Sequence, residues 1–135
     1  MEVSDKLITA IEQFNNADFF SAHDSFEEIW LDCRTGEKEF LQGLVQLSIG
    51  MFHLVSGNLN GAVSQLRKSV EKLEKFSPEF SEIDVFYVVS KSKNLIFEIE
   101  DFQKSDNSQS LQKLITHFIF PIKNQKENRY GNKDN

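Results

Sequence analysis

The stretch from residue 37 to residue 56 constrains the fold more than any other part of the chain. Its apolar residues lie on almost every side of a helix, at Phe40, Leu41, Leu44, Val45, Leu47, Ile49, Met51, Phe52 and Leu54. A helix that is apolar all round must be covered by other parts of the protein. We therefore expect a central hydrophobic helix over about residues 37–56, enclosed by neighbouring helices.

The rest of the chain shows the start and stop signals of further helices. Residues typical of N-caps precede apolar residues at helical spacing, at Ser4, Asp18 and Asp84. The 135 residues include only six Gly and two Pro, too few for a β-rich chain with many tight turns. The predicted fold class is all-α, a compact array of five to six helices. We expect a single helical domain over residues 1–122 and a disordered polar tail over residues 123–135.

Charge and cysteine content narrow the classes of partner and compartment. Fifteen Lys and Arg against twenty-one Asp and Glu give a net charge of −6, which argues against a nucleic-acid partner. No stretch is long and apolar enough to span a membrane, so no membrane partner is expected. A single cysteine, Cys33, suits a reducing compartment. The N-terminus has no secretory signal pattern, and together these features predict a soluble cytoplasmic protein.

The segment that follows Asp18 places polar residues among its aromatic ones. At about 100° per residue, His23 and Glu27 fall on one stripe of a helix together with Phe19 and Trp30. Ionisable groups on an apolar face are expected to be paired. We therefore predict a buried polar pair of His23 and Glu27, whose loss in Glu27→Ala would cost about 3–5 kcal/mol.

The central helix carries a matching polar stripe. Gln42, Gln46 and His53 project in similar directions, with Gly43 and Gly50 beside them. Glycine inside a helix costs roughly 1 kcal/mol relative to alanine, which suggests that a neighbouring helix approaches closely there. We expect that neighbour to be the helix with His23 and Glu27, so that these two helices form the tightest pair. His23 or Glu27 should then lie within hydrogen-bond reach of Gln42, Gln46 or His53. The candidate buried polar cluster has six members: His23, Glu27, Trp30, Gln42, Gln46 and His53.

Three interpretations of this cluster remain open at the level of sequence. The first is a satisfied polar core with a structural role. The second is a pocket for a small molecule or an anion. The third is a metal site, in which His23, Glu27 and His53 supply two imidazoles and a carboxylate, a set that suits iron or zinc. The first is favoured, so no cofactor or metal is predicted.

Two runs of residues resemble a known family. The first is Phe14-Asn15-x2-Asp18-Phe19-Phe20-x-Ala22-His23-Asp24-x2-Glu27-Glu28-x-Trp30, and the second is Phe40-Leu41-Gln42-Gly43-Leu44-Val45-Gln46-Leu47 with His53, Gly57-Asn58 and Gly61-Ala62. They resemble the motifs of the domain-of-unknown-function 309 family over about residues 5–75. The resemblance implies a small all-α protein with no established activity. Asp24 stands where members typically carry Glu. Ile83-Asp84-Val85 resembles a later Gly-Ile-Asp segment of the family, in which Glu82 stands where glycine is usual.

These observations favour a non-enzymatic binding or interaction protein whose polar cluster is mainly structural. The alternative is a small-molecule- or metal-binding enzyme of hydrolase type, with Glu27 as base and His23 and His53 as ligands or proton shuttles. An open cavity at His23 and Glu27 would favour the enzyme, whereas a filled core would exclude it. Homo-oligomerisation and a small ligand are both compatible with the sequence.

Overall fold

The computed structural model describes residues 4–105 and 110–124. Within these ranges the chain forms six α-helices, a short 3-10 helix and two very short strands. They are α1 (Asp5–Asn15), α2 (Phe19–Asp32), α3 (Lys38–Val55), α4 (Leu59–Leu73), η1 (Glu74–Phe76), β1 (Glu79–Phe80), β2 (Ile83–Asp84), α5 (Val85–Lys104) and α6 (Leu111–Phe118). This confirms the predicted all-α array. The three expected N-caps are also confirmed, because the side chains of Ser4, Asp18 and Asp84 accept hydrogen bonds from the first turns of α1, α2 and α5.

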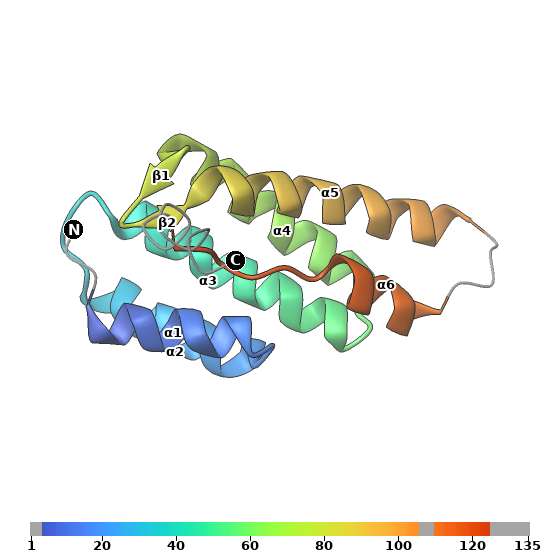
Figure 1. Ribbon diagram of the computed structural model, residues 1–135, viewed down its shortest axis with the longest axis horizontal. Helices are drawn as coiled ribbons and strands as arrows, with labels where there is room; N and C mark the ends of the chain where they lie inside the picture. Colours follow the sequence, from blue (N-terminus) through green and yellow to red (C-terminus); the bar gives the residue numbers. More distant parts are fainter. Residues whose placement is uncertain (1–3, 106–109, 125–135) are drawn as a thin grey trace, which may run out of the picture.

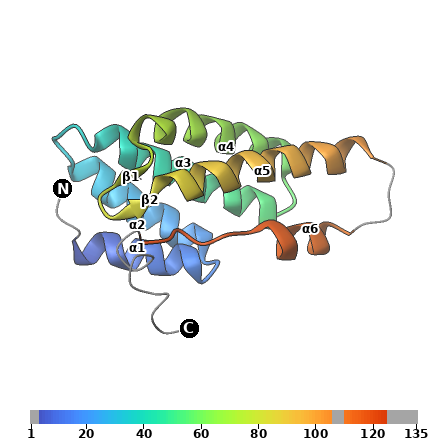
Figure 2. The same cartoon turned by 45° about the horizontal axis from the view of Figure 1, so that its top comes forward.

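The central position of α3 is confirmed as well. It lies between the α1–α2 pair on one side and α4 with α5 on the other (Figures 1 and 2). Ten of its eighteen residues are buried, which is the burial that its nearly continuous apolar surface requires. No helix in the part of the chain that the structure describes is long and apolar enough to cross a membrane.

The closest neighbour of α3 differs from the expected one. The most extensive helix pairing joins α3 to α4, and the pairing of α3 with α2 is smaller. A Cβ on Gly43 would lie 2.7 Å from Leu73 Cδ2, and one on Gly50 would lie 3.0 Å from Leu66 Cγ. Both of those leucines belong to α4. The prediction that the glycines receive α2 is therefore wrong: their side of α3 faces α4, where the Ser69 hydroxyl also donates to the Gly43 carbonyl at 2.8 Å.

A small hairpin joins α4 to α5. β1 and β2 pair antiparallel, and the turn residues Ser81 and Glu82 have φ of 52° and 62°. Glycine adopts this left-handed region most readily. The backbone at position 82 therefore favours glycine, the residue that the resemblance implies there, although this chain carries Glu82.

The chain beyond α6 returns along the molecule and closes the core. The segment runs from α6 back towards β2 (Figure 1), where the Lys123 carbonyl accepts a hydrogen bond from Asp84 N and Asn124 forms a bridge with Ile83. The folded unit therefore extends at least to Asn124, two residues beyond the expected end at residue 122. The rest of the predicted polar tail, residues 125–135, lies outside the described residues.

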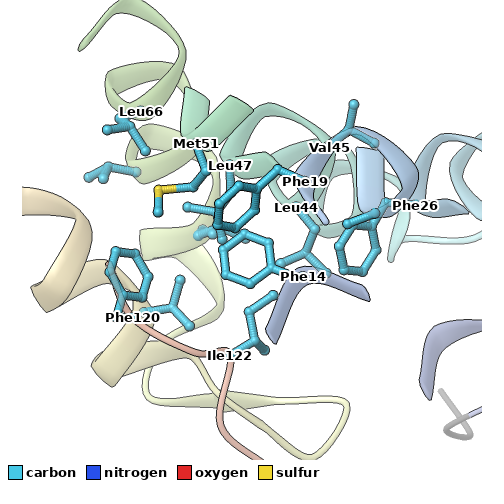
Figure 3. Packing of buried hydrophobic residues seen from close by; sticks show 14 of the residues in the cluster. Phe14, Phe19, Phe26, Leu44, Val45, Leu47, Met51, Leu66, Phe120 and Ile122 are labelled. Carbon is cyan, nitrogen blue, oxygen red and sulfur yellow. The ribbon is translucent and has the colours of Figure 1, made fainter. Parts of the chain in front are cut away.

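The core is built from aromatic and aliphatic side chains of both halves of the chain. Phe14 of α1 and Phe19 of α2 meet edge to face with ring centroids 5.0 Å apart. Figure 3 shows these rings beside Leu44 and Leu47 of α3, with Phe120 and Ile122 entering the same core from the C-terminal segment. The buried side of α2 is therefore set by its contacts with α1 and α3, and the C-terminal segment packs against α1, where the Phe14 and Phe120 ring centroids lie 6.4 Å apart.

Candidate functional site

The orientation of α2 decides where His23 and Glu27 lie. Its buried residues are Phe19, Ala22 and Phe26, which define a stripe at spacings of three and four residues. On a regular helix His23 lies about 65° and Glu27 about 105° from the centre of that stripe. Accordingly, the His23 side chain is 22% exposed and the Glu27 side chain 42%. The prediction that both lie in the middle of the buried face is wrong: they lie at its edge.

The contacts of His23 are mainly with its own helix. Its Nδ1 lies 3.4 Å from Asp24 Oδ1 and its Nε2 lies 3.9 Å from Glu27 Oε2. The ring also packs against Phe20, with centroids 5.8 Å apart. One ligand atom from each of His23, Asp24 and Glu27 can be chosen so that all three lie within 4.8 Å of one another. This set combines an imidazole with two carboxylates, which is chemistry that a divalent transition-metal ion accepts.

Trp30 marks the point where the end of α2 is fastened to the start of α3. The Lys38 ammonium donates to the Trp30 carbonyl at 3.0 Å and to the Cys33 carbonyl at 3.4 Å. It also lies 5.1 Å from the centroid of the Trp30 ring, within the range of a cation–π contact. A lysine at the C-terminal end of α2 also complements the helix dipole there. The arrangement gives Trp30 a structural role at the α2–α3 corner.

His53 is engaged at the opposite end of α3, in the turn to α4. The Asn58 Nδ2 lies 3.3 Å from His53 Nδ1, and Asn58 Oδ1 accepts from Gly61 N at 3.0 Å as the N-cap of α4. A Cβ on Gly61 would lie 2.6 Å from Asn58 Nδ2 and 3.0 Å from His53 Cδ2. A side chain at position 61 would therefore displace the Asn58 amide or the His53 ring. His53 therefore supports the α3–α4 turn rather than a shared centre with His23.

Gln42 and Gln46 lie on the outer side of α3. Both side chains are half-buried, and Gln46 Oε1 is buried without a hydrogen-bond partner. The antiparallel register of α2 and α3 follows from Phe20, whose ring lies 5.7 Å from that of Phe52, and from Lys38 at the other end of the pair. His23 and Glu27 thus lie alongside the part of α3 that carries Gln46.

The six predicted residues share one seam of the molecule but do not form a hydrogen-bonded cluster. Among the residues described, no hydrogen bond or ion pair joins His23 or Glu27 to Gln42, Gln46 or His53. The two histidines are connected only through rings, since Phe20 contacts His23 and Phe52 contacts His53. All six side chains are half-buried, so the seam is neither a filled core nor an enclosed pocket.

Four surface cavities lined by described residues lie elsewhere. One of about 630 Å³ lies between α5 and α6, beside Glu98, Thr116 and His117. The others lie between α4 and α5, between α1 and α2, and near Cys33. The lining of these four includes neither His23 nor Glu27. They therefore give no support to an active site at this pair.

The pKa of one group in the described part of the chain is clearly displaced. A hydrogen bond and the charge of Glu39 raise the pKa of Lys75 above its usual value, against a smaller opposing effect of desolvation. The contact is 2.6 Å long and lies on the surface. It joins the start of α3 to the segment that follows α4, so its role is also to fasten helices together.

Two features of the seam escape sequence reasoning. One is the pair of exposed rings: Phe20 is 56% exposed, and Phe52 is 38% exposed although it belongs to the helix that was expected to be enclosed. The second feature is the edge of α4 beside the seam, which carries Lys68 and Lys72. The spacing of Gly61, Gln65, Lys68 and Lys72, at steps of four, three and four residues, is the signal that places them on one side of a helix.

Comparison with known proteins agrees with the resemblance. Residues 7–65 match the family described as "Domain of unknown function (DUF309)". The matched range covers most of α1, all of α2 and α3, and the first part of α4. It therefore contains every residue of the seam. No curated protein matches the chain.

Proposed function

We propose that this chain, which belongs to the DUF309 family through residues 7–65, acts by binding another protein chain and not by catalysis. In this proposal the half-buried polar residues hold α2, α3 and α4 in place beneath a binding surface. The surface is the outer side of these three helices. A small ligand is not needed for this role.

The exposed aromatic pair carries the proposal. Phe20 of α2 and Phe52 of α3 have their ring centroids 5.7 Å apart, and the two residues are 56% and 38% exposed. Large exposed apolar groups that lie next to each other mark interaction sites more often than isolated ones do. Aromatic residues also contribute more than most others to protein–protein binding. Phe20 and Phe52 are therefore the expected anchors of the contact.

The polar residues around this pair support a structural assignment. His53 is tied to the N-cap of α4 through Asn58, and the Trp30 carbonyl is tied to Lys38. Each contact fixes a corner between two helices of the surface. His53 and Trp30, two of the residues that the sequence singled out, thus have contacts that stabilise the fold and require no substrate.

Photo-crosslinking in cells tests this function. Benzoylphenylalanine replaces Phe20 in one variant and Phe86 in a matched control. Phe86 is 65% exposed and lies on α5. We expect a discrete crosslinked protein band from position 20 and none from position 86. Equal labelling from both positions, or no band from position 20, would contradict the proposal.

A metal-dependent enzyme is kept as a second candidate by one observation, the proximity of ligand atoms in His23, Asp24 and Glu27. The predicted third ligand, His53, is engaged at the α3–α4 turn, so Asp24 takes its place in this alternative. Imidazole and carboxylate ligands suit zinc. If the chain only binds another protein, we expect zinc to change neither its stability nor its binding.

The Glu27→Ala variant distinguishes the binding function from the metal site. The structure also lowers the loss of stability expected for this variant from the roughly 3–5 kcal/mol that a buried pair would give. The 3.9 Å separation from His23 and the 42% exposure of Glu27 indicate a solvent-screened pair, so we expect a loss of less than about 1 kcal/mol in the free energy of unfolding. Urea unfolding of Glu27→Ala and Glu27→Gln beside the wild type measures it. A zinc-dependent rise of the melting temperature that Glu27→Ala abolishes would favour the metal site instead.

A further inference from the structure

The outer side of α3 forms an uncharged stripe. Gln42, Gln46, Ile49 and His53 follow one another at steps of four, three and four residues and are all half-buried. This spacing keeps them on one side of the helix along nearly its whole length. The stripe is flanked by α2 on one side and by α4 on the other, and the two flanks differ in charge.

The α2 flank is acidic between apolar ends. Phe20, Asp24, Glu27 and Leu31 have the same spacing as the stripe on α3. Leu31 is 62% exposed, and Phe20 is nearly as open. Over its whole length α2 contains four acids and no Lys or Arg. Among the described residues the only group paired with Asp24 and Glu27 is His23.

The α4 flank is basic. Gly61, Gln65, Lys68 and Lys72 again follow steps of four, three and four residues. Gly61 lies against His53, and Lys72 Cβ lies 3.4 Å from the position of a Cβ on Gly43, so this flank runs beside the stripe on α3 from end to end.

The two lysines of this flank differ from neighbouring charges in their pairing. Arg67 pairs with Glu100 at 2.6 Å and Lys75 with Glu39 at 2.6 Å. No such pair is made by Lys68 or Lys72 within the described part of the chain. The two flanks thus carry opposite charges that are not neutralised by each other or by neighbouring Lys, Arg, Asp or Glu side chains.

The opposite charges lie at similar levels along α3. Phe20 is beside Phe52, so four and seven residues further along antiparallel α2, Asp24 and Glu27 lie near Ser48 and Val45. Lys72 is beside Gly43, so Lys68 lies near Leu47, because all three helices rise by about 1.5 Å per residue. Acid and base are therefore separated across the face and not along it.

We propose that this three-helix face is the interface between two copies of the chain, related by a twofold axis that runs parallel to α3. This dimer proposal rests on the proposed binding function and identifies the bound protein as a second copy of the chain. A rotation about such an axis exchanges the flanks, so that the acidic α2 of each copy faces the basic α4 of the other. The uncharged stripes on α3 then meet at the centre. A twofold axis across α3 would instead place acid against acid, which is unfavourable.

The apolar groups of the face fit this arrangement. Ile49 lies within the central stripe, and Phe52 of α3 contacts Phe20, which belongs to the α2 flank. An interface with uncharged residues at its centre and charges at its rim is typical of protein dimers. The self-complementary order of acidic, uncharged and basic stripes is what selects a second copy over an unrelated basic partner.

Charge exchange between two variants tests the dimer. We expect the wild type to have twice the 15.6 kDa mass of one chain in light scattering at micromolar concentration. Glu27→Lys alone and Lys68→Glu alone each place like charges opposite each other twice, and each should weaken association about tenfold or more. An equimolar mixture of the two variants should regain the dimer, because both contacts in the mixed pair again join opposite charges.

Matched controls keep the outcomes distinct. Asp101 is an exposed residue of α5, outside the proposed interface. Asp101→Lys changes the charge by the same amount as Glu27→Lys and should leave the dimer intact, while circular dichroism checks that every variant is folded. A monomeric wild type, or a mixture that stays monomeric while the wild type dimerises, would overturn the proposal. If the wild type is monomeric but position 20 crosslinks to a different protein, the binding function stands and the second copy is the wrong partner.

Discussion

Phe26→Ala is expected to lower the free energy of unfolding by about 3–5 kcal/mol, the usual cost of removing a buried aromatic ring. Phe26 is fully buried at the centre of the α2 stripe that faces the core, and Figure 3 shows its ring on the side of α2 next to α3. Its removal leaves a cavity that the surrounding helices fill only in part. Urea unfolding followed by circular dichroism measures the loss.

Phe20→Ala is the matched control for this prediction. The same ring is removed from the same helix, but Phe20 is 56% exposed, so we expect a loss of less than about 1 kcal/mol. If the dimer forms as proposed, this variant weakens association while the monomer remains stable. Equal losses for the two variants would show that α2 is rotated from the orientation described, with His23 and Glu27 in the interior.

The sequence was sufficient for the helical framework because local signals determine it. Ser4, Asp18 and Asp84 each satisfy a free N–H at the start of a helix, and this depends only on nearby residues. The central helix was predictable for a similar reason. A segment that is apolar on all sides has only one kind of position in a folded chain.

The orientation of α2 could not be predicted in the same way. A helical wheel that counts Phe20 and Leu31 as buried moves the apolar side of α2 towards Glu27, and the structure leaves both residues exposed. Hydrophobicity alone does not distinguish an apolar residue of the core from one on a binding surface. His23 and Glu27 were therefore expected too deep between α2 and α3.

The partner of the glycines on α3 also depends on information that is distant in the sequence. Gly43 and Gly50 indicate a close approach, but the residues that approach are Leu73 and Leu66 of α4. Nothing near the glycines specifies this choice. The buried Ser69 hydroxyl, which donates to the Gly43 carbonyl, could be recognised as part of the contact only when α4 was in place.

Leucine at either glycine is expected to separate α3 from α4. A Cβ on Gly50 would lie 3.0 Å from Leu66 Cγ and 3.3 Å from the Leu66 backbone nitrogen, and one on Gly43 would lie 2.7 Å from Leu73 Cδ2. The further carbons of leucine have no space unless α4 moves, and overpacking of this kind costs about 1–3 kcal/mol. Both Gly43→Leu and Gly50→Leu should therefore unfold at lower urea concentration than the wild type.

Gly36→Ala provides the comparison that assigns this loss to packing. A Cβ on Gly36 would have no atom within 4 Å, and its backbone needs no left-handed conformation. Alanine there reduces the freedom of the unfolded chain, so we expect stability to be unchanged or higher by up to about 1 kcal/mol. Unchanged unfolding midpoints for both leucine variants would mean that the glycines face solvent. In that case α4 would not lie against α3, and the basic flank that the proposed dimer needs would not be beside the central stripe.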